Sequence, residues 1–79
     1  MTGPPSSWPA VAASFDGGET GCGELLLDLM LFVRNHPSST VVLRAVDPGA
    51  PMEIPAWCRL TGHVLTEAQP PFFLIQTKP

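Results

Sequence analysis

The sequence predicts an α/β (α+β) two-layer sandwich, in which a four-stranded mixed sheet carries two helices on one face. Two observations predict this fold. Strand-like and helix-like segments alternate along the first two thirds of the chain, and the last third holds two strand-like segments joined by a three-residue link. The resulting order is β-α-β-α-β-β, without an internal repeat. A chain of 79 residues has room for one modest hydrophobic core and therefore for one domain.

The N-terminal segment, residues 1–9, holds three of the ten prolines together with glycine and serine. This composition is typical of a segment that packs poorly, so we expect a disordered or loosely docked lead-in. Residues 10–79 then form the single domain. Its first strand is predicted at residues 10–15, where every second residue falls on one face.

A glycine-containing loop, residues 16–21, leads to Cys22 and then to the longest apolar run of the chain. We expect a helix at residues 24–35, in which Glu24 and Asp28 mark a narrow polar stripe. The remaining apolar arc is wider than packing against one sheet requires. Two explanations remain open. The extra surface is buried under loops and the N-terminal segment, or it associates with a partner such as a second copy of the chain in a homodimer.

A central strand, a second helix and an antiparallel strand pair are predicted to follow. Residues 40–46 are almost entirely apolar and β-branched, which is typical of a strand buried on both faces. Prolines near its start and Gly62 at its end delimit the second helix. Residues 63–68 and 72–78 are predicted strands, and the short link between them favours antiparallel pairing.

The charge and hydropathy patterns exclude several classes of function. The formal net charge is −3 with only four Lys and Arg residues, so the chain lacks the basic patch that nucleic-acid binding needs. The longest apolar run is too short to span a bilayer and the N-terminus lacks signal-peptide features, so we expect a cytoplasmic protein without membrane insertion. Only 14% of the residues are charged, against about 25% in average domains. A partner could therefore cover part of the surface.

The two cysteines have different predicted surroundings. Cys22 would start the first helix, where unpaired backbone N–H groups and the positive end of the helix dipole favour the reactive thiolate. The alternative for this residue is a small buried apolar side chain. Cys58 falls on the inward face of the second helix, and we expect it to pack in the core. A disulfide between them would need Cα atoms within about 7 Å, which the sequence leaves open.

Small and acidic residues flank the candidate thiol. Gly21 and Gly23 stand on either side of Cys22, where they would supply turn geometry and room for the approach of a partner. Glu24 follows in the first turn of the predicted helix. The loop around the cysteine is thus predicted to be open to other molecules.

Three further polar residues are candidates for a supporting role. Asp16 and Asp47 each end a strand that leads into a helix. Turn and capping hydrogen bonds explain both, although such strand ends also border the functional rim of α/β layers. His63 would serve hydrogen bonding at a strand start, or alternatively lie near the Cys22 loop and modulate its protonation. The cysteines and histidines lack the paired spacing of zinc ligands, so we expect no metal.

Two stretches resemble a known family. The first is Phe15-Asp16, five intervening residues, Cys22 and a leucine-rich helix. The second, residues 47–63, contains Asp-Pro, Glu-Ile-Pro, an aromatic residue, Cys-Arg and Gly-His in this order. Both are similar to segments of the TusA (SirA-like) sulfur-carrier family, over about residues 11–78. The resemblance implies the sandwich fold, sulfurtransferase activity without a cofactor, and Cys22 as the cysteine that carries sulfur as a persulfide.

The Cys-Pro-x-Pro signature of that family is replaced here by Cys22-Gly23-Glu24-Leu25. Without the first proline the loop is expected to be more mobile, and Glu19 and Glu24 place negative charge near a thiol that is therefore less activated. Two functions follow as expectations. One is a sulfur carrier that exchanges persulfide sulfur with donor and acceptor proteins, and the other is a non-catalytic interaction or regulatory module of the same fold.

Overall fold

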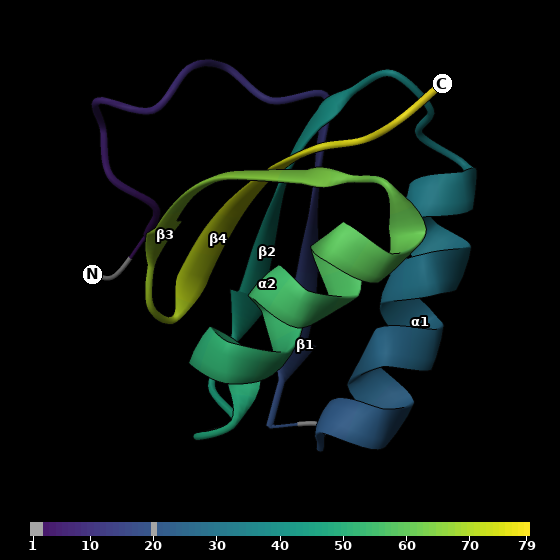
Figure 1. Ribbon diagram of the computed structural model, residues 1–79. Coiled ribbons are helices and arrows are strands. Elements are labelled where there is room, and N and C mark those ends of the chain that lie inside the picture. Colours follow the sequence, from purple (N-terminus) through teal and green to yellow (C-terminus); the bar gives the residue numbers. More distant parts are fainter. Residues whose placement is uncertain (1–2, 20) are drawn as a thin grey trace.

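The computed structural model describes residues 3–19 and 21–79 and contains the six predicted elements in the predicted order (Figure 1). The elements are β1 (Ala13–Gly18), α1 (Cys22–Arg34), β2 (Thr40–Ala45), α2 (Ala50–Thr61), β3 (Val64–Gln69) and β4 (Phe72–Gln76). No helix in the described part of the chain is long and apolar enough to cross a membrane.

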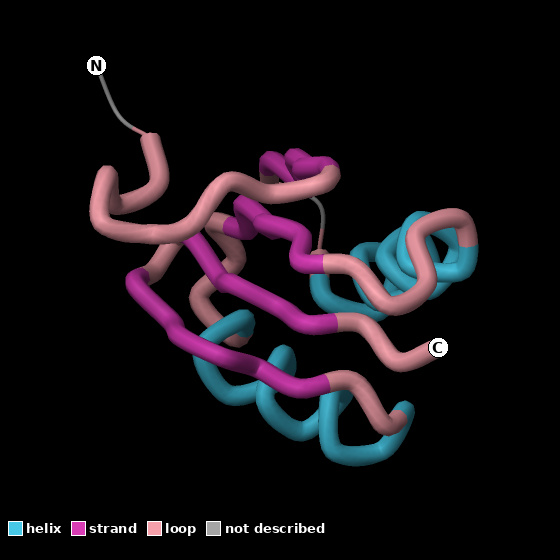
Figure 2. Tube along the Cα trace, turned by 90° about the horizontal axis from the view of Figure 1, so that it is seen from above, coloured by secondary structure: helices cyan, strands magenta, loops and turns pink. Residues whose placement is uncertain are grey.

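The four strands form one mixed sheet in the order β1-β2-β4-β3. β1 and β2 are parallel, and β4 pairs antiparallel with both β2 and β3. Both helices lie on one side of this sheet, while the N-terminal segment crosses the other side (Figure 2). The predicted fold class, a two-layer sandwich with a mixed sheet, is therefore confirmed.

The main core lies between the sheet and the two helices. α1 and α2 each contribute one apolar side to it, and the strands contribute alternate residues, as the two-residue period of a strand requires. The buried members are Leu25, Leu29, Val33, Val41, Leu43, Ala45, Ala50, Ile54, Trp57, Cys58, Phe73 and Ile75. β2 is interior in the sheet, and its residues Val41, Val42 and Leu43 are all buried. The prediction of a central strand buried on both faces is thus confirmed.

A smaller core covers the opposite face of the sheet. Val42, Phe72 and Leu74 are buried there, and Trp8 and Val11 of the N-terminal segment pack against them. The described part of the segment therefore packs on the sheet face opposite the helices, and the prediction that it buries the wide apolar arc of α1 is wrong for these residues.

The outer side of α1 stays open in the described chain. Leu27 is 54% exposed and Leu31 is 50% exposed, and Met30 beside them is also exposed. Loops do not bury these side chains either. These three side chains are thus not buried under described parts of the chain, and an association surface at this helix stays a prediction.

The first strand and the first helix differ from their predicted bounds. β1 was expected at residues 10–15 but runs from Ala13 to Gly18, so it includes the first three residues of the predicted glycine loop. A register shift between Asp16 and Gly18, together with a left-handed Gly18 (φ 54°), lets the strand continue through two glycines. α1 begins at Cys22, two residues before the predicted start.

The bounds of β2, β3 and β4 agree with prediction to within two residues, whereas Pro55 lies inside α2 and not before it or in its first turn. Gly62 closes α2 in the left-handed conformation (φ 88°), and its N–H donates to the carbonyl of Cys58 at 2.9 Å. This is the helix ending that glycine favours, because it has no Cβ to clash at positive φ. β3 and β4 pair antiparallel, as their short link predicts.

Candidate functional site

Cys22, which the sequence predicts to be the reactive thiol, is the first residue of α1. It lies at the end of the sheet where the parallel strands β1 and β2 finish and where α1 and α2 both begin (Figure 1). In α/β layers, loops at the carboxyl ends of parallel strands form the usual ligand-binding rim. Cys22 thus lies at the carboxyl ends of the parallel strands, the end of the sheet where such loops are found.

Among the described residues, no side chain caps the backbone donors at the start of α1. Gly21 precedes the helix in an extended conformation (φ −66°, ψ 155°). The first intrahelical bond runs from the Leu25 N–H to the Gly21 carbonyl at 2.8 Å. The N–H groups that precede Leu25 in the first turn have no helical acceptor and face any group bound there. Glu24 in the same turn adds a negative charge that opposes a bound anion.

The backbone on both sides of Cys22 is open. A Cβ atom built on Gly21 or on Gly23 would meet no heavy atom within 4 Å. Another molecule could therefore approach this turn without displacing described parts of the chain. The expectation of room for a partner at the two glycines agrees with this geometry.

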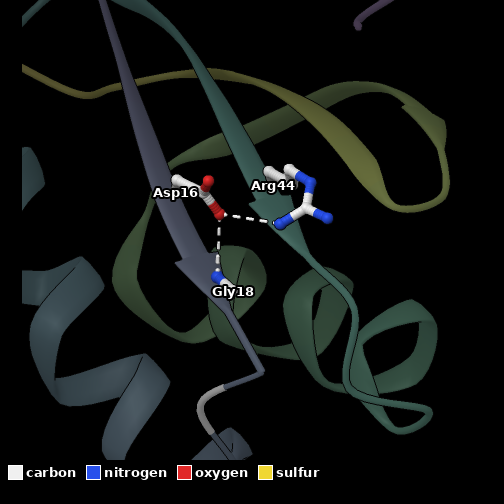
Figure 3. Close-up of polar contacts among 3 residues, drawn as sticks. All are labelled: Asp16, Gly18 and Arg44. Atoms are coloured by element: carbon white, nitrogen blue, oxygen red, sulfur yellow. Dashed lines mark hydrogen bonds and ion pairs between the residues drawn. The ribbon is translucent and has the colours of Figure 1, made fainter. Parts of the chain in front are cut away.

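Asp16 is held by an ion pair at the end of β1 (Figure 3). Its Oδ1 atom accepts hydrogen bonds from Nη1 of Arg44 at 3.0 Å and from the N–H of Gly18 at 2.9 Å. Both contacts hold the pKa of the carboxyl below its ordinary value of 3.8, the Arg44 hydrogen bond having the larger effect. Gly17, the next residue, faces Leu25 of α1, so alternation places Asp16 on the opposite side of the sheet. Asp16 therefore fixes the strand end and does not face the helices.

Asp47 lies at the same edge as Cys22, in the link between β2 and α2. Its Oδ2 atom accepts a hydrogen bond from the N–H of Gly49 at 2.9 Å, which is a turn contact of the kind predicted. The N–H of Val46 donates to the carbonyl of Gly18 at 3.2 Å and ties the ends of β1 and β2 together. Asp47 thus shapes the rim next to the start of α1.

His63 lies at the opposite end of the sheet. β3 runs parallel to β2, because both are antiparallel to β4, so β3 begins where β2 begins. The ring of His63 stacks on Trp57, and its Nδ1 atom accepts a hydrogen bond from the Lys78 N–H at 3.1 Å. Burial, and then the Lys78 charge, lower its pKa below 6.5. The structure therefore assigns His63 to hydrogen bonding at the strand start, away from Cys22.

Cys58 is a free cysteine in the main core, where its side chain is 2% exposed. Burial raises the pKa of its thiol to about 11. The prediction of a packing role is confirmed. Among the described residues, no group of three or more His, Cys, Asp and Glu side chains is arranged to hold a metal ion.

Sequence reasoning missed a cleft of about 410 Å³ at the His63 end of the molecule. The C-terminal halves of α1 and α2 and the last residues of the chain line it. Its charged members, Arg34 and Lys78, are far apart in sequence and belong to no motif. Only a fold-level argument could have found them, because the ends of two predicted helices and of the last strand meet there.

No protein-family model matches the chain, and no curated protein matches it. The resemblance to sulfur carriers therefore rests on the residues quoted above.

Proposed function

We propose that this protein is a sulfur carrier that accepts and donates persulfide sulfur on Cys22. The observation that carries the proposal is the position of this cysteine at the first residue of a 13-residue helix, between two glycines with open space around them. The free backbone N–H groups and the helix dipole there favour the thiolate, which is the nucleophile in sulfur exchange.

The proposed reaction is a sulfur exchange without net oxidation. The Cys22 thiolate attacks the outer sulfur of a donor persulfide, so that a new S–S bond forms and the S–S bond of the donor breaks. The donor cysteine leaves as a thiolate. In the second half-reaction an acceptor thiolate attacks the outer sulfur on Cys22, which returns the Cys22 thiolate. The first-turn N–H groups would stabilise the negative charge in both states.

Two further features support the proposal. The chain adopts the sandwich that the family resemblance implies. The second family-like stretch, residues 47–63, begins in the turn before α2, at the same end of the sheet as the start of α1. A fold of this type hosts many functions, so the argument depends on Cys22 and its surroundings.

The test is mass spectrometry of the chain after incubation with glutathione persulfide. The wild-type chain is expected to gain one sulfur atom and to lose it on addition of an acceptor thiol. Cys22→Ser should gain none, whereas the matched control Cys58→Ser should gain sulfur as the wild type does. Equal sulfur gain by Cys22→Ser, or no gain by the wild type, would exclude a carrier function on Cys22.

A second function is favoured by the exposed side of α1. Leu27, Met30 and Leu31 form an apolar surface on this helix, and such surfaces commonly mark sites of protein association. In this alternative the chain is an interaction module, and a homodimer through α1 is its simplest form. Sedimentation of the wild type and of Leu31→Glu would test it, because the variant should remove any self-association. A wild type that stays monomeric would exclude the homodimer.

A further inference from the structure

The cleft between the C-terminal ends of α1 and α2 has the size and lining of a small-molecule site. Its volume of about 410 Å³ lies within the range of about 300–1,000 Å³ that is usual for ligand pockets. Met30, Val33, Trp57 and Leu60 give it apolar walls. Trp57 and His63 stack with ring centroids 5.2 Å apart and an interplanar angle of 24°, so one side of the cleft is built on a fixed aromatic pair.

The charged side chains that line the cleft are both cationic. Arg34 and Lys78 line it and are two of the four Lys and Arg residues of the chain. None of the seven Asp and Glu residues is among the lining residues, although the chain as a whole is acidic. The positive charge is therefore concentrated at one place, and neutralisation by a nearby carboxylate side chain does not explain it.

The ends of the two helices reduce this positive charge without cancelling it. A helix C-terminus carries about −0.5 elementary charge, so two of them contribute about −1 against the +2 of the two cations. His63 adds a hydrogen-bond donor. Because its Nδ1 atom accepts from the Lys78 N–H, the proton of the neutral ring is on Nε2. The cleft thus combines apolar walls, two cationic side chains and a neutral donor.

We propose that this cleft binds a small organic anion with an aromatic or aliphatic body and one carboxylate or sulfonate group. The body packs on Met30, Leu60 and the Trp57–His63 pair, and Arg34 and Lys78 bind the anionic group. The site lies at the other end of the sheet from Cys22. Its occupancy therefore does not depend on sulfur chemistry.

A pair of isosteric probes tests the proposal by NMR titration of the full chain. 1-Naphthoate should shift the backbone amides of Leu60, Gly62 and Lys78 in a saturable way with a Kd below about 1 mM. The neutral 1-naphthamide should bind at least about fivefold more weakly, because it offers the same ring without the charge. The ring protons of His63 report the same event, because a bound anion offsets the repulsion by Lys78 and raises the pKa of His63.

Variants separate the cleft from general charge effects. Arg34→Ala and Lys78→Ala should each weaken naphthoate binding by about three- to fivefold. The matched control Arg59→Ala removes an exposed cation from α2 that does not line the cleft, and it should change the Kd by less than about twofold. A chain extended by Gly-Ser after Pro79 moves the terminal carboxylate of the test protein away from the cleft and should bind at least as tightly.

Three results would overturn the proposal. One is the absence of saturable shifts up to about 5 mM naphthoate. The second is equal binding of naphthoate and naphthamide, which would make the cleft an apolar surface only. The third is an equal loss of binding in Arg59→Ala and in Arg34→Ala, which would reduce the effect to overall charge.

Discussion

The imidazole of His63 stacks on the indole of Trp57, with ring centroids 5.2 Å apart and an interplanar angle of 24°. This contact joins the last turns of α2 to the start of β3. The hydrogen bond from the Lys78 N–H to Nδ1 of His63 then adds the residues after β4 to the same cluster. One titratable side chain therefore connects three segments at the end of the sheet away from Cys22.

This arrangement predicts a stability that depends on pH through His63. Burial and the Lys78 charge lower the pKa of His63 in the folded chain, so the unfolded chain takes up the proton first as the pH falls. The contribution of His63 is fully present above about pH 6.5 and is lost as the pH falls through the folded-state value. Urea unfolding at a series of pH values should show a shallower decline below pH 6.5 for His63→Asn, which keeps an acceptor but does not titrate. Identical slopes for the two proteins would contradict this.

Thr77 is predicted to stabilise the link between α1 and β2. Its side chain is 3% exposed, and its hydroxyl donates to the His36 carbonyl and accepts from the Ser39 N–H at 2.7 Å. Thr77→Val keeps the shape but removes the hydroxyl partner of two part-buried polar groups, so it should lower the free energy of unfolding by about 1–3 kcal/mol. Thr66→Val, the same change at an exposed position of β3, should stay within about 0.5 kcal/mol. Denaturant titration measures both, and equal effects would argue against this role of the hydroxyl.

Two glycines near the candidate site should respond to alanine with opposite signs. A Cβ on Gly17 would overlap Leu25 Cδ1 and would lie 3.2 Å from the Arg44 carbonyl oxygen, so Gly17→Ala should destabilise the fold by about 1–3 kcal/mol. Gly23 has open space and is the second residue of α1, so Gly23→Ala should stabilise by at most about 0.5–1 kcal/mol. Thermal unfolding of both variants tests the packing of β1 against α1. Destabilisation by both changes would contradict the open space around Gly23.

Cys58 is predicted to be unreactive in the folded chain and to destabilise it at high pH. Burial raises the pKa of its thiol from 9.0 to about 11. The unfolded chain therefore loses this proton first, and the stability should fall as the pH rises from about 9 to about 11. In a Cys22→Ser background, iodoacetamide near pH 8 should label Cys58 only after denaturant is added. Labelling of the folded protein at the unfolded rate would show that the thiol is accessible.

The sequence predicts the parts of the fold in which local pattern and packing agree. The apolar, β-branched run of β2 and the glycine that ends α2 are of this kind, because each is explained by its own residues. The predicted end of β1 was wrong, because Asp16 and the two glycines after it are turn formers by local preference. Pairing with β2 and the contact between Asp16 and Arg44 hold them in a strand. The end of β1 therefore depends on a contact with Arg44, which is 28 residues away in sequence.

The sequence predicts the position of Cys22 but not the cleft at the other end of the sheet. The position of Cys22 at a helix start follows from the apolar run behind it and the glycines around it. The covering of the second sheet face by Trp8, and the cleft with Arg34 and Lys78, depend on which distant segments meet. A single sequence carries no periodic signal for such meetings.

The register shifts of the sheet occur in its two outer strands. They lie between Asp16 and Gly18 in β1 and between Leu65 and Glu67 in β3, whereas β2 and β4 keep one register from Thr40 to Arg44. An interrupted outer ladder is a poor template for the strand of another molecule. In a chain with only 14% charged residues, an outer strand with such an irregularity is expected to pair less readily with a strand of another molecule.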